Sequence, residues 1–147
     1  MIDFEKHFLF MQKVYFISRN EINKEVPIVS IIVCKNKIVG KGFNNMISSS
    51  NPNAHAEILA LDTASTKLNN FALKDSTIYI SQEPCIMCIE SIINYKIRNI
   101  VYASSSSNKN RWNYLQYLIS RKNLDIVINI KENKCKKIIK KFFYLMR

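Results

Sequence analysis

The chain has 147 residues, of which 48% are hydrophobic, and this is enough for one domain with a sizeable core but short for two. No run of eighteen apolar residues is present, so the sequence predicts no membrane span, and Asp3 and Glu5 stand where an export signal would be basic. We therefore expect one domain over residues 1–147 in the cytoplasm. Its four cysteines are then more plausible as metal ligands or free thiols than as disulfides.

The formal net charge is +11, because Lys and Arg together number 22 and Asp and Glu only 11. A positive excess of this size suits a polyanionic partner such as nucleic acid. The sequence is also rich in Ile, Lys and Asn, which an AT-rich genome would produce without any selection for binding. Charge alone therefore leaves both explanations open.

Hydrophobic spacing and turn residues predict a chain of alternating strands and helices after an initial helix. The predicted elements are, in order, a helix over 3–21, a hairpin of strands over 28–34 and 37–43, a loop over 44–53, a helix capped by Asn53 and ending near Leu68, a strand over 77–81, a helix beginning near Pro84, a strand over 98–103, a loop over 104–110, a helix over 112–120, a strand over 124–130 and a helix over about 132–146. Strand and helix alternation predicts an α/β fold with parallel pairing among the later strands.

Three helices are expected to bury one apolar side each. The residues expected on the core side of the first helix are Phe4, Phe8, Met11, Val14, Tyr15 and Ser18. Those expected on one side of the helix after Asn53 are Ile58, Leu61, Ser65 and Leu68. The last helix has apolar residues on one side and lysines on the remainder, and it is either a solvated face or a surface for a polyanion. Cys34 is predicted to be a buried thiol and Cys135 to be incidental.

His55-Ala56-Glu57 and Pro84-Cys85-Ile86-Met87-Cys88 carry the chemistry. One His and two Cys can give three ligands to a tetrahedral Zn²⁺ and leave the fourth position to water, which is the ligand count of a catalytic zinc. A carboxylate at Glu57 beside a zinc-bound water could carry protons between that water and a substrate.

The spacing of these residues restricts where they can lie. Residues three apart share a helix face, so Cys85 and Cys88 can act together if a helix begins near Pro84. Residues two apart point about 200° apart round a helix, so His55 and Glu57 converge only at the N-terminal end of one. We therefore expect two helix N-termini to face one metal ion.

These two motifs are those of the zinc-dependent nucleobase deaminases. The chain most resembles the bacterial tRNA adenosine deaminases, and the resemblance also covers Glu25-Val26-Pro27, Gly42-Phe43-Asn44 and the closing Phe142-Phe143. It implies a three-layer α/β/α fold with a five-stranded mixed sheet, one Zn²⁺ per subunit on His55, Cys85 and Cys88, and a homodimer.

The resemblance further implies hydrolytic deamination of adenosine to inosine at the first anticodon position of an arginine tRNA. Glu57 is then the proton carrier, the tRNA anticodon stem-loop is the partner, and contacts to the substrate fall on Asn44, Ala54, Phe43 and Phe143. Asn44 would hydrogen-bond the target base; an Asn that only stabilises its own turn is the alternative.

The chain departs from the family in the segment Ser104 to Asn110, where four serines and Lys109 replace the usual Asp and Gly residues. Altered substrate recognition is the hypothesis that this departure suggests. Zinc chemistry also leaves room for a guanine or deoxycytidylate deaminase. A structural zinc module that binds RNA would need a fourth protein ligand, for which Cys34 and Cys135 are the other thiols.

Overall fold

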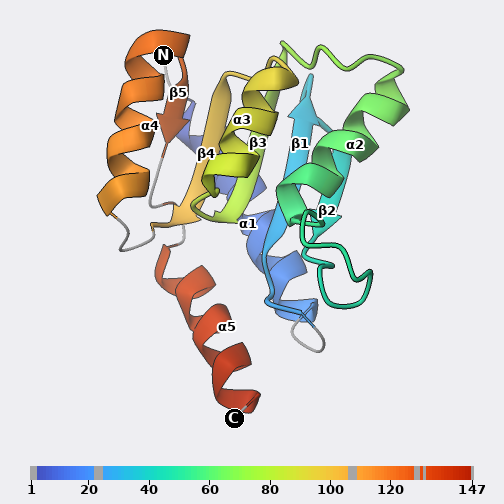
Figure 1. The fold of residues 1–147 in the computed structure, drawn as a ribbon, viewed down its shortest axis with the longest axis vertical. Helices are drawn as coiled ribbons and strands as arrows, with labels where there is room; N and C mark the ends of the chain where they lie inside the picture. The colour runs from blue at the N-terminus through green and yellow to red at the C-terminus, as the bar shows by residue number, and fades with distance from the viewer. Residues whose placement is uncertain (1–2, 22–24, 106–108, 128–129, 131, 147) are drawn as a thin grey trace.

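The computed structural model describes residues 3–21, 25–105, 109–127, 130 and 132–146 (Figure 1). The elements along the chain are α1 (Phe4–Asn20), β1 (Val29–Cys34), β2 (Lys37–Phe43), α2 (Ala56–Leu68), β3 (Ser76–Gln82), α3 (Ile86–Asn94), β4 (Asn99–Ser104), α4 (Lys109–Lys122), β5 (Asp125–Val127) and α5 (Glu132–Leu145). Every predicted helix and strand is present. Among the described residues, no helix combines the length and apolar character needed to cross a membrane.

The five strands form one mixed sheet in the order β2-β1-β3-β4-β5. β1 pairs antiparallel with β2 and with β3, whereas β3, β4 and β5 run parallel. The expected hairpin turns at Lys35 and Asn36, which both have positive φ. Since β3 and β4 are parallel, their carboxyl ends lie at the same edge of the sheet, and the start of β1 and the end of β2 lie there too.

Helices cover both faces of the sheet, which confirms the three-layer architecture (Figure 1). One apolar core lies between the sheet and α2, α3 and α4, and it includes Ile32, Ile78 and Ile100. The other lies between the sheet and α1 and α5, and it includes Met11, Tyr79 and Cys135. Cys135, for which no functional role is expected, is 1% exposed and packs α5 against the sheet.

α2 packs on the edge strand β2 through small residues, and this differs from the predicted contact face. Its buried residues are Ala56, Glu57, Ala60, Leu61 and Ala64, whereas Ile58 is only half-buried. The reason lies in β2, which carries the only two glycines of the chain. A Cβ on Gly40 would stand 2.3 Å from the Ala60 carbonyl oxygen, and one on Gly42 only 1.9 Å from that of Ala56. Helix and strand therefore approach at backbone distance, which large side chains would prevent.

The predicted core face of α1 is confirmed at Met11, Val14 and Ser18, and it is wrong at Phe4 and Phe8. Phe10, Met11 and Val14 are buried, whereas Phe4 is 62% and Phe8 51% exposed. The apolar residues surround most of this helix, so spacing alone did not single out the face that meets the sheet. His7 also faces inward, and its Nδ1 lies 3.0 Å from the Tyr79 hydroxyl.

Two boundaries also differ from the prediction. Asn53 does not cap α2, because its N–H donates to Asn51 Oδ1 and the N-cap residue is His55, without a side-chain capping bond. α4 begins at Lys109 rather than Trp112, which shortens the predicted serine-rich loop. Ser104 belongs to β4, and residues 106–108 of that loop lie outside the described residues. The predicted fifth strand is present as β5 over Asp125–Val127, and residues 128 and 129 of the predicted range also lie outside the described residues.

Candidate metal centre

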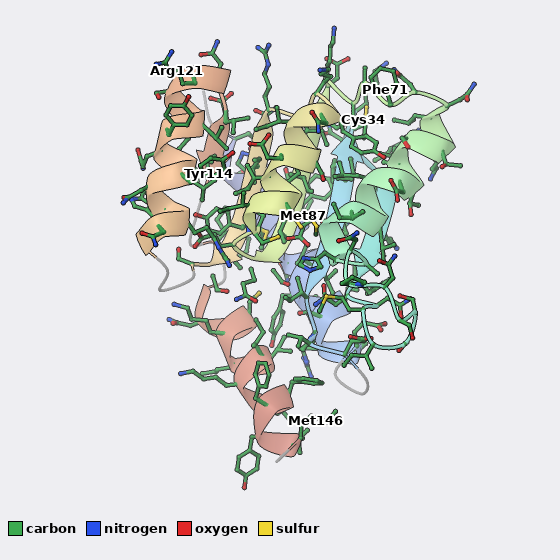
Figure 2. All side chains as sticks on the ribbon, in the orientation of Figure 1. Cys34, Phe71, Met87, Tyr114, Arg121 and Met146 are labelled. Carbon is green, nitrogen blue, oxygen red and sulfur yellow. The ribbon has the colours of Figure 1, made fainter. Side chains whose placement is uncertain are left out.

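The two motifs meet at the starts of two helices, as the spacing predicted. His55 is the N-cap residue of α2 and Cys85 the N-cap residue of α3, and both have extended backbone angles. Cys88 lies in the first turn of α3, where Figure 2 also shows Met87. Pro84 precedes the helix instead of entering its first turn. Both helices begin at the sheet edge formed by the carboxyl ends of β3 and β4. The chain leaving β3 therefore places Cys85 beside the start of α2.

Three donor atoms converge there. The Nδ1 atom of His55 lies 3.7 Å from Cys85 Sγ and 3.5 Å from Cys88 Sγ, and the two sulfurs are 3.4 Å apart. Tetrahedral Zn²⁺ with its ordinary Zn–N and Zn–S bonds would require donor separations of about 3.5–3.8 Å. The His55–Cys85–Cys88 group therefore fits a zinc ion with a modest opening of the sulfur pair, and it is the group with metal-binding geometry among the described residues.

The remaining thiols do not supply a fourth ligand. Cys34 ends β1 at the opposite edge of the sheet, and Cys135 lies in the core on the other face. Three protein ligands leave one coordination position for water or substrate, which is the arrangement of a catalytic metal site. A structural zinc site would need four protein ligands, and neither Cys34 nor Cys135 lies where it could be the fourth.

Glu57 lies beside this group and is only 4% exposed. Its pKa is raised to about 7, mainly by burial and further by the nearby Cys85, against the lowering effects of its own backbone N–H, of His55 and of a hydrogen bond with the Cys88 thiol. A carboxyl group in this pKa range can both accept and release a proton near neutral pH.

The Cys85 and Cys88 thiols are joined by a hydrogen bond between their sulfur atoms. This bond lowers the pKa of Cys85 to about 5, with the backbone N–H groups of Cys88 and Met87 also lowering it. The same interaction raises the pKa of Cys88, together with burial and the nearby Glu57 carboxylate. Cys85 is thus a thiolate at neutral pH, and a bound cation would be needed to ionise both.

Three metal-binding donors beside a buried carboxylate are the groups that a hydrolytic deaminase needs. Comparison with known proteins points to the same class of enzyme. The family model of the MafB19-like deaminases matches residues 5–147. A "tRNA-specific adenosine deaminase" of Buchnera aphidicola subsp. Schizaphis graminum is 37% identical over 126 residues, covering 84% of this chain and 83% of that protein. The chain belongs to this deaminase family.

Solved structures show that the deaminase fold is shared widely. A structure from "Biochemical and Structural Studies of A-to-I Editing by tRNA:A34 Deaminases at the Wobble Position of Transfer RNA" has a TM-score of 0.79 at 22% identity and covers 88% of this chain and 97% of that one. A guanine deaminase from Nitrosomonas europaea has a TM-score of 0.78 at 21% identity, covering 90% and 81%. At this identity the two structures establish the fold and do not distinguish the substrates.

Asn44 and Ala54 lie next to the metal group of this deaminase. Asn44 is 8% exposed, and its Oδ1 accepts the backbone N–H of Ala56 at 3.1 Å. Asn44, which was predicted to hydrogen-bond the target base, therefore also caps the start of α2 through its Oδ1. Its Nδ2 group remains as a donor for a substrate. Ala54 is buried, and its carbonyl oxygen accepts the N–H of Asn45 at 3.0 Å.

The two aromatic residues predicted to contact the substrate differ in their surroundings. Phe43 is half-buried and packs with the core on the α1 face of the sheet. Phe143 is 51% exposed on α5 and packs edge-on against Phe142 at a ring separation of 5.4 Å. Asn44 is thus tied by a hydrogen bond to Ala56, the neighbour of the predicted ligand His55, whereas the contacts of Phe43 and Phe143 with a substrate stay predictions. The close approach of α2 to the backbone at Gly42 was not predicted from the sequence, and its one signal there is that both glycines of the chain stand in one strand.

Proposed function

We propose that this deaminase converts adenosine to inosine at the first anticodon position of tRNA, with an arginine tRNA as the substrate by family resemblance. The observation that carries the proposal is the 37% identical relative named for tRNA adenosine deamination, together with the three-donor group beside a buried glutamate. The reaction consumes water and releases ammonia.

His55, Cys85 and Cys88 would hold one Zn²⁺, which when bound supplies a water of lowered pKa. Glu57 takes a proton from the attacking water and passes it to N1 of the adenine while the C6–O bond forms. It then takes the second proton from the new C6 hydroxyl and delivers it to the amino group, so that the C6–N bond breaks and ammonia leaves. Its pKa near neutrality suits both directions of transfer. Asn44 holds the base through Nδ2 while its Oδ1 fixes the start of α2.

The anticodon loop of the tRNA is the part of the substrate whose bases can leave the stack. α5 supports binding of such an RNA, because it extends past the sheet edge at which α2 and α3 begin (Figure 1). Its described residues include five lysines and the exposed Phe143 and Tyr144. Figure 2 shows Met146 near its far end, away from the sheet. Phosphate contacts and base stacking are the expected roles of these side chains.

Two further parts of the proposal follow from the family resemblance. We infer a cytoplasmic enzyme, because its tRNA substrate is used there, and a homodimer in which the neighbouring subunit completes each RNA site. The net charge of +11 is compatible with an RNA substrate. Sedimentation with and without an anticodon stem-loop would test the dimer.

The decisive experiment is inosine formation at the first anticodon position of an arginine tRNA, run beside free guanine and deoxycytidylate. Glu57→Ala serves as the control, because it should retain the metal and lose turnover. Inosine formed only by the parent protein supports the substrate and the role of Glu57 together. Ammonia released from guanine or deoxycytidylate, without inosine in tRNA, would replace the proposed substrate and keep the zinc chemistry. Loss of metal from Glu57→Ala would make Glu57 a ligand instead of a proton carrier.

A further inference from the structure

We propose that Glu25 is a positioning residue that fixes the tip of the loop between β2 and α2 for RNA binding. The inference deepens the proposed function and depends on it for the substrate. Glu25 is 8% exposed, and its Oε1 accepts two backbone N–H groups, from Ile47 at 2.8 Å and from Ser48 at 2.9 Å. Two N–H donors on one carboxylate oxygen form charge-assisted bonds, which are stronger than bonds between neutral groups.

Glu25 can act as an anchor because its own segment is fixed to the sheet edge. The carbonyl oxygen of Ile28 accepts the N–H of Asn44 at 3.2 Å, and the N–H of Val29 donates to Ser81 Oγ at 3.0 Å. Pro27 is buried as well. The carboxylate therefore transmits the position of β1 to the loop tip.

Backbone hydrogen bonds within the loop join its tip to its base, from Ser49 N–H to the Asn45 carbonyl oxygen and from Asn51 N–H to that of Met46, but the bonds to the rest of the protein differ between the two. The bond from Asn45 N–H to the Ala54 carbonyl oxygen closes the base, next to Asn44 and His55. The tip carries Ile47, whose side chain is 74% exposed and so offers an apolar contact to an unstacked base. Loss of Glu25 should loosen this tip while the base, and with it the metal group, stays in place.

The tip has little packing of its own, because the side chains of Ile47 and Ser48 are exposed. A cavity of about 480 Å³ has Glu25, Asn45 and Ser48 in its lining. The place of the tip relative to β1 therefore depends on its hydrogen bonds to Glu25, whereas the bonds within the loop fix only its internal shape. The same cavity is lined by Glu21, an exposed carboxylate at the end of α1, which makes Glu21→Ala a matched control.

Steady-state deamination of an anticodon stem-loop tests the kinetic part. Glu25→Ala should raise KM for the RNA at least tenfold, with kcat within threefold of the parent and metal content unchanged. Glu25→Asp, which keeps the charge on a shorter side chain, should also raise KM. Glu25→Gln, whose amide oxygen can accept both N–H groups, should stay within threefold in KM, and Glu21→Ala within twofold. A Glu25→Ala or Glu25→Asp enzyme with the KM of Glu21→Ala, or one that loses kcat and metal together, would overturn the proposal.

Amide hydrogen exchange tests the anchor without reference to activity. Exchange of a peptide covering residues 45–53 should accelerate at least tenfold in Glu25→Asp and Glu25→Ala, and exchange in α2 should not change. Unchanged exchange in the loop would refute the anchor even if the RNA is deaminated normally. If the parent forms no inosine, the proposed function fails, and the exchange measurement still decides whether Glu25 holds the loop.

Discussion

Adding one methyl group at Gly42 should reduce activity far more than the accompanying loss of stability would explain. A Cβ there would stand 1.9 Å from the carbonyl oxygen of Ala56 and 2.6 Å from the N atom of Ala60, and both contacts are with backbone. Contacts under 3.0 Å essentially do not occur for real Cβ atoms, so Gly42→Ala must move the start of α2 away from β2. Its φ is not positive, so the limitation is space and not conformation.

The displacement can be sized from these distances. Opening the 1.9 Å contact to 3.0 Å moves the backbone at Ala56 by about 1.1 Å, and overpacking of this kind costs roughly 1–3 kcal/mol of stability. Ala56 lies between the metal-binding His55 and Glu57, so both move with it. A misplacement of about 1 Å at reacting groups can cost on the order of 100-fold in rate. We therefore expect kcat/KM of Gly42→Ala to fall by about two orders of magnitude.

Gly40→Ala is the control for the stability part of this effect. Its added Cβ would lie 2.3 Å from the Ala60 carbonyl oxygen and 2.8 Å from the Ala64 Cβ, which is the same kind of conflict one helical turn farther from the site. We expect a similar loss in urea unfolding and a fall in kcat/KM of less than about tenfold. Inosine formation should be assayed well below the melting temperature of both variants. Equal loss of activity in the two, or near-parental activity of Gly42→Ala, would refute this account of how α2 is placed.

Three other outcomes are expected. Cys88→Ala should bind no zinc by elemental analysis and melt at lower temperature, because metal binding and folding share free energy; a parental zinc content would exclude Cys88 as a ligand. Burial lowers the pKa of His7 below 6.5, so its contribution to stability is complete above pH 6.5 and is lost as the pH falls through the lower, folded pKa. Thermal melts should therefore show the parent losing stability relative to His7→Gln on acidification, and parallel curves would contradict this. Replacing Lys140 and Lys141 by Gln should make the slope of log binding constant against log salt concentration, measured with a stem-loop RNA, less steep by about 0.7 per lost phosphate contact. An unchanged slope would mean that the lysines of α5 face solvent and do not contact the RNA.

The three donors of the metal group could be predicted from the sequence, because they lie in two short motifs. Intervals of two residues between His55 and Glu57 and of three between Cys85 and Cys88 leave few geometries in which all can act together. The prediction that two helices begin at one point is confirmed by the N-cap positions of His55 and Cys85. Local spacing also gave the strand and helix alternation, since buried runs and turn residues are encoded within a few residues of each other.

Tertiary structure decided which faces and which backbone groups are used. The side of α2 that meets the sheet is a row of alanines, because Gly40 and Gly42 on another element admit a close approach that hydrophobic spacing does not detect. The cap of α2 comes from Asn44, eleven residues before the N-cap residue His55, and the loop tip is held by Glu25 from a segment before β1. Ligand types and helix starts are local properties of this chain, whereas the contacts that place them depend on residues that only the folded sheet brings together.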